Sequence, residues 1–390
     1  MQVHAILSKH LSSVMHKTRL QTLSVLVESL FHAKFFSLTG LGRSLNTQAQ
    51  ERSAIRRVDR FLANKRLQQD RLSIYGTICK LIIGSQKRPF IIVDWSPIPH
   101  QNNHVLRAAL VTSGRALTLY EEVHPETRLG HPKIHENFLM HLNAMLDKDC
   151  RPILITDAGF HSSWFKSVKT LGWDYVGRIR GNKYYRCHTD DAWGAIKTLY
   201  PTVTGTPKCL GEIELCKESN FITTLYCYKG RRLGRAAKTK RGKIKQSAQS
   251  KKQAKTNQEP WLLVSSLAHT TPEKVIKIYR LRMQIEEGFC DLKSTRYGFG
   301  FEHVNTKHLY RLKVFLLLAM LASFLAWLVG WLAENANLHS AYQANSTKHK
   351  RVLSLFYLGY RIIRKEAKRI ANLFIHAVIK HFPSFHEGLK

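Results

Sequence analysis

Acidic residues are scarce in this 390-residue sequence. It has 27 aspartate and glutamate residues against 61 lysine and arginine residues, which gives a formal net charge of +34. So large a cationic excess favours a polyanionic partner, because neutralising phosphates releases condensed counterions. The deficit of acids therefore favours a nucleic-acid-binding protein over a ribosome-associated or membrane-surface protein.

Closely spaced cysteine pairs are also missing. None of the seven cysteines forms a C-x-x-C pair, so a structural zinc site is unsupported and reduced thiols are expected. The first 17 residues lack a sustained apolar run and a small-residue cleavage site, which predicts no export signal. We therefore expect a cytoplasmic protein, associated with the nucleoid through DNA.

One uncharged segment has the length of a membrane helix. Residues 314–333 are 20 consecutive residues without a charge, enough to span a bilayer. The segment is solitary, and it follows directly on a helix that carries candidate catalytic residues. A helix that is apolar all round is also found at the centre of large domains. We therefore predict a buried core helix and no membrane partner.

The N-terminal region, residues 1–85, has the apolar spacing of helices. A short helix, a polar break and a basic helix follow one another between residues 37 and 66. Four arginines lie on the polar side of the basic helix: Arg52, Arg56, Arg57 and Arg60. The pattern resembles a helix-turn-helix that contacts DNA, and an ordinary amphipathic helix with a solvated basic face fits the spacing equally well.

Residues 86–180 have an α/β pattern. Two apolar strands, 88–94 and 152–157, each end in an aspartate, and a hairpin of two strands (104–112 and 116–123) follows the first. Helices are expected at 133–146 and 162–171, and a further strand at 174–179. This order matches the ribonuclease H topology.

The remaining sequence divides into three segments. Residues 181–268 predict a β-rich insertion with a basic flexible loop at 229–258, where 12 lysines and arginines and no acid fall between Lys229 and Lys255. Residues 269–340 would contain a helix from Thr270 or Thr271 to about Lys293, and then the buried core helix. Residues 341–390 predict a basic helical tail.

Three carboxylates suit a metal site. Asp94 and Asp157 stand at strand ends, where a sheet opens to solvent, and Glu286 lies on the helix that precedes the core helix. On a continuous helix, Tyr279, Arg282, Glu286 and Lys293 would share one face within about 60°. Two divalent ions held by oxygen ligands suit phosphodiester chemistry and favour Mg²⁺ or Mn²⁺ over zinc. A solvated ion pair between Arg282 and Glu286 is the alternative for the helix alone.

The spacing of these helix residues resembles a known signature. Tyr279-x2-Arg282-x3-Glu286-x6-Lys293 is similar to the Y-(2)-R-(3)-E-(6)-K signature of DDE transposases in the IS-four family of bacterial insertion sequences. The words Val-Asp-Trp-Ser around Asp94 and Thr-Asp-Ala-Gly-Phe around Asp157 also resemble that family. So does a mostly β insertion that interrupts a ribonuclease H-like fold before the glutamate.

The resemblance implies a mechanism and partners. Asp94, Asp157 and Glu286 would be the metal ligands, and Tyr279, Arg282 and Lys293 would hold the DNA backbone near the cleaved end. The family nicks DNA, forms and resolves a hairpin and transfers the strand, with a flipped base stacked on a tryptophan at the place of Trp261. Implied partners are transposon end inverted repeats, target DNA and a second copy of the chain in a synaptic homodimer.

Three alternatives stay open at this point. The chain could be a ribonuclease H-like nuclease or resolvase without strand transfer. It could also be a non-catalytic DNA-binding protein descended from a transposase. Finally, Trp261 could be an ordinary core residue.

Overall fold

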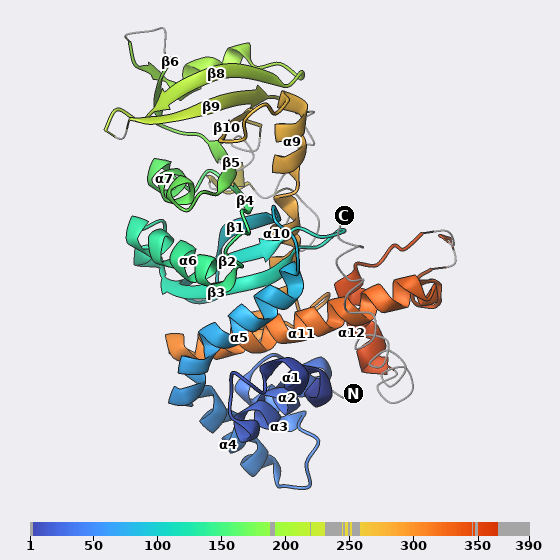
Figure 1. The fold of residues 1–390 in the computed structure, drawn as a ribbon. Helices are drawn as coiled ribbons and strands as arrows, with labels where there is room; N and C mark the ends of the chain where they lie inside the picture. Colours follow the sequence, from blue (N-terminus) through green and yellow to red (C-terminus); the bar gives the residue numbers. More distant parts are fainter. Residues whose placement is uncertain are drawn as a thin grey trace. The chain divides into compact units, whose positions relative to one another are not determined.

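A computed structural model describes residues 3–187, 192–218, 220–230, 244, 246–248, 250–251, 258–344, 346–347 and 350–365. The chain divides into two compact units: unit 1 is Met1–Pro152 with Met283–Lys390, and unit 2 is Ile153–Arg282. Figure 1 labels the helices and strands of both. Both units combine helices and strands. The expected mixed α/β class is therefore confirmed.

Unit 1 begins with helices, as the sequence predicts. They are α1 (Val3–Leu11), α2 (Lys17–His32), α3 (Leu38–Arg43), α4 (Glu51–Leu62) and α5 (Lys65–Ile83). Polar side chains fix two of the starts: Ser37 Oγ accepts the Gly40 N–H at 3.0 Å, and Asn64 Oδ1 accepts the Leu67 N–H at 2.9 Å. Such caps satisfy backbone donors that the first helical turn leaves unpaired.

An antiparallel sheet follows in unit 1. Its strands β1 (Phe90–Pro97), β2 (Asn103–Leu110) and β3 (Leu117–Pro125) lie in the order β3-β2-β1. Helix α6 (Pro132–Met145) contacts the sheet through His135 Nε2, which accepts the Trp95 indole N–H at 2.9 Å. Two short 3-10 helices, Glu126–Arg128 and Phe301–His303, also belong to this unit.

Strand β1 corrects one expectation. It does not end at Asp94 but continues to Pro97, with Asp94 opposite Arg107 and Ser96 opposite Val105 on β2. Residues after Asp94 keep pairing because β2 extends far enough to give their backbone groups partners. Asp94 is therefore a mid-strand residue.

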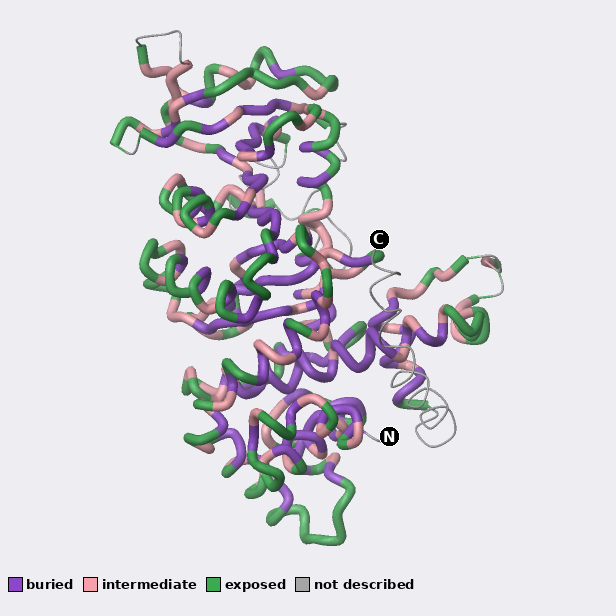
Figure 2. Tube along the Cα trace, in the orientation of Figure 1, coloured by how far each residue is buried: buried purple, intermediate pink, exposed green. Residues whose placement is uncertain are grey.

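The part of unit 1 described after residue 282 has helices α10 (Met283–Lys293), α11 (Leu309–Asn335) and α12 (Leu355–Lys365), with a 3-10 helix at Leu338–Tyr342. Helix α11 is long and apolar enough to cross a membrane, yet 89% of its most apolar stretch is buried inside the unit (Figure 2). The predicted burial of residues 314–333 is thus confirmed.

Two glycines let α11 and α12 cross closely. A Cβ added at Gly330 would lie 1.9 Å from the Leu355 carbonyl oxygen, and one at Gly359 would lie 1.8 Å from that of Ala326. Helix α12 covers part of the predicted C-terminal helical region, and residues beyond 365 lie outside the described chain.

Unit 2 is rich in strands, as expected for residues 181–268. Its strands are β4 (Ile153–Thr156), β5 (Asp174–Ile179), β6 (Tyr184–Cys187), β7 (Gly194–Ala195), β8 (Lys208–Leu215), β9 (Phe221–Tyr228) and β10 (Trp261–Ser265). They lie in the order β4-β5-β10-β9-β8-β6-β7, and among these neighbours only β4 and β5 are parallel. Helices α7 (Ser162–Thr170) and α9 (Pro272–Arg280) and a 3-10 helix (Ile196–Thr202) complete the described part. Most of the predicted basic loop 229–258 lies outside the described residues.

The predicted continuous helix up to Lys293 is wrong. Helix α9 ends at Arg280 and α10 begins at Met283. Between them the N–H groups of Leu281 and Arg282 bond to carbonyls three residues back, those of Ile278 and Tyr279, both at 3.1 Å. This tighter bonding interrupts the α-helical pattern. Tyr279 therefore lies on α9, whereas Glu286 and Lys293 lie on α10, with Arg282 between the two helices. The four residues do not share one face of a single helix, contrary to the expectation from their spacing.

Candidate active site

Asp94 belongs to a row of charged residues across the sheet of unit 1. The strand register places Asp94 beside Arg107 on β2, and Arg107 beside Glu121 on β3. All three residues are buried, and the Trp95 N–H donates to Asp94 Oδ1 at 2.8 Å. A cation thus stands between two buried acids.

Arg107 and Glu121 form the inner pair of this row. Arg107 donates from Nε and Nη2 to Glu121 Oε2 at 3.1 and 2.9 Å, and the two side chains are 5% and 1% exposed. Burial raises the pKa of the Glu121 carboxyl, although Arg107 opposes the shift. The guanidinium carbon also lies 4.2 Å from the centre of the Phe289 ring on α10. Arg107 therefore connects the charged row to the helix that carries Glu286.

Lys293 reaches the strand of Asp94 from the end of α10. Its Nζ donates to Ser96 Oγ at 2.7 Å, across 197 residues of sequence, and lies 5.3 Å from the Phe289 ring centre. The pKa of Lys293 is lowered to about 8, chiefly by burial and also by the positive charge of Arg107, while Asp94 opposes the shift. The structure thus places two of the predicted site residues, Asp94 and Lys293, in one neighbourhood.

Glu286 lies on the same helix but on a more open surface. Helix α10 packs against β1, and the neighbours Ile285 and Phe289 are buried. Glu286 itself is exposed. The structure therefore places Glu286 at an exposed position on a helix that is packed against the strand of Asp94.

Asp157 belongs to unit 2, immediately after β4. Its Oδ1 accepts the Gly159 N–H at 2.7 Å, which closes a tight turn at the end of the strand. The residue is half-buried. Nearby, burial lowers the pKa of His161, with Lys183 lowering it further and Asp157 opposing the shift. Asp157 thus stands at a strand end, as the sequence predicts.

The other predicted DNA-contacting residues of unit 2 gather around aromatic rings. The Trp261 ring centre lies 4.9 Å from that of Tyr279 and 5.8 Å from that of Tyr228. The guanidinium carbon of Arg282 lies 6.0 Å from the Tyr279 ring centre. Trp261 is half-buried, whereas Tyr279 is 3% exposed.

Sequence reasoning missed several residues of these neighbourhoods. They are Ser96, Arg107 and Glu121 in unit 1, and Tyr228 and Arg280 in unit 2, where Arg280 Nη2 donates to Tyr228 Oη at 2.9 Å. A usable signal existed for Arg107, because it is a charged residue flanked by apolar residues in its strand. Glu121 is followed directly by Glu122, so its own burial is not marked by the pattern. Ser96 and Tyr228 carried no such signal.

The basic helix of the N-terminal region is amphipathic in the structure. Arg52, Arg56, Arg57 and Arg60 on α4 are all exposed, whereas Ala54, Val58, Phe61 and Leu62 are buried. Helix α3 packs on α4 so closely that a Cβ at Gly42 would lie 2.7 Å from the Ile55 Cα. The four arginines therefore form an exposed basic stripe on a short helix pair.

The metal site expected from the sequence requires the three carboxylates to come together. Among the described residues, no group of three or more His, Cys, Asp or Glu side chains is arranged so that it could hold a metal ion. Asp94 and Glu286 come from unit 1 and Asp157 from unit 2. Their donor atoms are carboxylate oxygens, which suit a hard divalent cation such as Mg²⁺ or Mn²⁺.

Comparison with models of protein families assigns a large part of the chain. Residues 85–325 match the family described as transposase DDE domain, and this range contains Asp94, Asp157 and Glu286. No curated protein sequence matches the chain.

Proposed function

The chain belongs to the family of DDE transposase domains, since the match covers more than half of it, and from this premise we propose that it carries out cut-and-paste transposition of a bacterial insertion sequence. The domain is catalytic and transfers phosphoryl groups, so the chain is an enzyme that acts on DNA. Within the family we propose the IS-four type with the Y-R-E-K signature, a ribonuclease H-like catalytic core and a cytoplasmic location. The spacing from Tyr279 to Lys293 supports this narrower assignment.

We assign metal binding to Asp94, Asp157 and Glu286. The observation that carries this assignment is the bond from Lys293 to Ser96, together with the packing of α10 on β1. They join the helix of Glu286 to the strand of Asp94, although the two acids are far apart in sequence. When bound, two Mg²⁺ or Mn²⁺ ions would activate the attacking oxygen and stabilise the leaving oxygen of a scissile phosphate.

The remaining site residues bind and orient DNA in this proposal. Lys293 and Arg282 supply cations for backbone phosphates near the cleaved end, and Tyr279 supplies a hydroxyl. The exposed arginines of α4 bind the terminal inverted repeats, where contacts to phosphates fix the register of the protein on DNA. A homodimer would hold two ends together before strand transfer into target DNA.

The overall proposal is tested with DNA carrying the sequences that flank the gene. In the presence of Mg²⁺, the purified protein should nick these ends and join a pre-cleaved end to a target plasmid. Asp94→Asn, Asp157→Asn and Glu286→Gln proteins serve as controls and should do neither. Nicking without any joining would instead establish a nuclease or resolvase, and binding without either reaction would reject the proposal.

We further propose that the second strand is cut through a hairpin, with an extruded base stacked on Trp261. Flipping a base costs a few kcal/mol, and stacking on an aromatic ring returns about 1–3 kcal/mol. The half-buried indole, close to Tyr279, supports this role.

Trp261→Ala tests the hairpin route. The variant should nick the first strand at a near-normal rate and accumulate nicked DNA, with hairpin formation slowed at least about tenfold. A substrate that is abasic at the flipped position should partly restore hairpin formation, because no base then has to be unstacked. An insoluble variant that also loses nicking would identify Trp261 as a core residue, and the hairpin proposal would lose its structural support.

A further inference from the structure

The loop between β2 and β3 is held to helix α10 by hydrogen bonds and ion pairs. The side-chain amide of Gln284 pairs with both backbone groups of Thr112: its Nε2 donates to the Thr112 carbonyl at 2.9 Å, and its Oε1 accepts the Thr112 N–H at 3.2 Å. Thr112 follows the end of β2 at Leu110, and the Gln284 amide gives both of its backbone groups a hydrogen-bond partner there. Two opposed hydrogen bonds fix both the distance and the direction of this contact.

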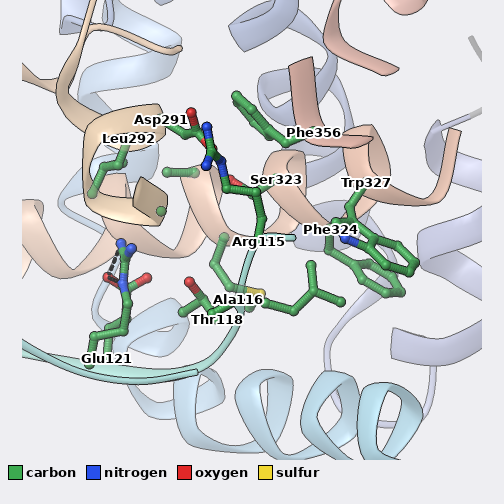
Figure 3. Close-up of a pocket in the computed structure, with 15 residues that line it drawn as sticks. Arg115, Ala116, Thr118, Glu121, Asp291, Leu292, Ser323, Phe324, Trp327 and Phe356 are labelled. Carbon is green, nitrogen blue, oxygen red and sulfur yellow. Dashed lines mark hydrogen bonds and ion pairs between the residues drawn. The ribbon is translucent and has the colours of Figure 1, made fainter. Parts of the chain in front are cut away.

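Arg115, at the other end of the loop, makes ionic contacts with the same helix. Its Nε donates to Asp291 Oδ2 at 2.9 Å, and its Nη1 pairs with the Glu287 carboxylate. Figure 3 shows the Arg115 side chain extended toward Asp291 beside Ser323 of α11. Asp291 is 7% exposed, and burial raises its pKa to about 6 although Arg115 opposes the shift. We call this set of contacts the α10 latch. Its residues are Thr112, Arg115, Gln284, Glu287 and Asp291.

The latch and the candidate site residues occupy different faces of α10. Gln284, Glu287 and Asp291 are spaced i, i+3 and i+7, so they share one side of the helix. Glu286 and Lys293 are seven residues apart and differ by about 20° around the axis, whereas Glu286 lies about 160° from Gln284. The latch therefore holds the helix from the side opposite the candidate site.

Two residues of the α10 latch, Arg115 and Asp291, line a small cavity. This cavity of about 30 Å³ is lined by Arg107, Arg115, Glu121 and Asp291, together with apolar residues of α11 and Phe356 of α12. Burying so many charges contributes little net stability, because desolvation offsets much of their attraction. Directional polar contacts do, however, favour one rotation of the helix over others, which apolar packing alone specifies less sharply.

We propose that Gln284 and Arg115 are positioning residues, which fix the rotation and axial position of α10 and thereby place the Glu286 carboxylate for metal binding. This inference rests on the proposed role of Glu286 as a metal ligand. Neither side chain contacts the proposed reacting atoms. Removing either one leaves the three carboxylates in the chain but allows α10 to turn, so metal affinity falls while contacts to DNA phosphates persist.

The test uses Gln284→Met, which keeps the length of the side chain and removes both hydrogen bonds. Gln68→Met is the matched control, since Gln68 Nε2 donates at 2.9 Å to the carbonyl of Tyr310, which lies on α11 of the same unit. Mn²⁺ binding to the full chain is measured by electron paramagnetic resonance, and nicking of end DNA is titrated with Mg²⁺. We expect Gln284→Met to weaken Mn²⁺ binding at least fivefold and to raise the Mg²⁺ requirement similarly, with metal-free DNA binding unchanged and Gln68→Met like wild type.

Arg115 gives an independent arm if the Gln284 variant does not fold. Arg115→Met should weaken Mn²⁺ binding, and Arg115→Lys should recover at least half of the loss, because an ammonium can still reach Asp291. Wild-type Mn²⁺ affinity in folded Gln284→Met or Arg115→Met protein would overturn the inference, provided that Glu286→Ala loses it. If Glu286→Ala itself binds Mn²⁺ normally, the assignment of Glu286 as a ligand fails, and the inference fails with it.

Discussion

Asp94 and Asp157 follow similar apolar runs in the sequence but differ in the structure. After Asp94, the strand continues through Trp95 and Ser96 in register with β2. After Asp157, the chain turns at once, because the Gly159 N–H bonds to the aspartate side chain. The same local pattern therefore ends a strand where the following residues supply a turn, as they do after Asp157.

The difference also sets what holds each carboxylate. Asp94 is buried in a row with Arg107 and Glu121. It also lies close enough to Lys293 to raise the pKa of that lysine, against the effect of burial. Asp157 is half-buried and depends on its own loop. We infer that Asp94 is sensitive to changes on distant elements, whereas Asp157 is sensitive to changes within three residues of it.

Removing any one of the three proposed metal-binding carboxylates should have the largest effect on nicking. Asp94 and Asp157 should then be equally necessary, in spite of their different surroundings. Asp94→Ala, Asp157→Ala and Glu286→Ala should each lower nicking by at least about a thousandfold, because each would lose a metal ligand. DNA-end binding should be unchanged or slightly tighter, since a negative charge that repels phosphate is gone. The measurements are single-turnover nicking and fluorescence anisotropy. Residual nicking within tenfold of wild type would remove that residue from the site.

Breaking the charged row should affect Asp94 and spare Asp157. Arg107→Met leaves Glu121 buried without its cation, and breaking such a buried pair costs about 3–5 kcal/mol. The free energy of unfolding of unit 1 should fall by a similar amount. It is measured by unfolding in urea, with tryptophan fluorescence as the signal. The double variant Arg107→Met with Glu121→Leu should recover most of the loss. A single variant as stable as wild type would show that the pair does not support the row.

The converse test changes the loop of Asp157. A Cβ at Gly159 would lie 3.0 Å from Asp157 Oδ1, so Gly159→Ala forces the carboxylate to move by a few tenths of an ångström. We expect about a tenfold higher Mg²⁺ requirement for nicking, since metal affinity depends on ligand placement. Gly76→Ala is the control, because its Cβ would meet only Met145 Cγ at 3.6 Å. An unchanged Mg²⁺ titration would show that the Gly159 turn is not needed.

The sequence predicted much of this organisation because its signals are local. Apolar runs indicate the strands at 88–94 and 152–157, and helical spacing of apolar residues indicates the N-terminal helices. The burial of residues 314–333 is predicted from the position of this solitary segment directly after the helix with candidate catalytic residues. What it missed depends on distant neighbours: the extension of β1 needs β2, and the interruption at Leu281 occurs without a proline or glycine to announce it. The Gln284 and Arg115 contacts likewise join elements about 170 residues apart, so no local pattern identifies them.

The smallest effect should appear in the pH dependence of DNA binding. Burial lowers the pKa of Lys293 to about 8, so the folded state binds fewer protons at this residue than the unfolded state between about pH 8 and its ordinary pKa. Stability therefore rises with pH in that window, whereas binding a phosphate favours the charged lysine and should weaken as pH rises. For a free pKa of 8, metal-free end binding should fall about fourfold between pH 7 and pH 8.5. Lys293→Arg should remove this dependence, because a guanidinium stays charged.

The same measurement separates the two aspartates. Because Asp94 opposes the lowering of the Lys293 pKa, Asp94→Asn should move the transition in DNA binding to lower pH, and Asp157→Asn should leave it in place. Equal shifts in the two variants would contradict the separate surroundings of these aspartates.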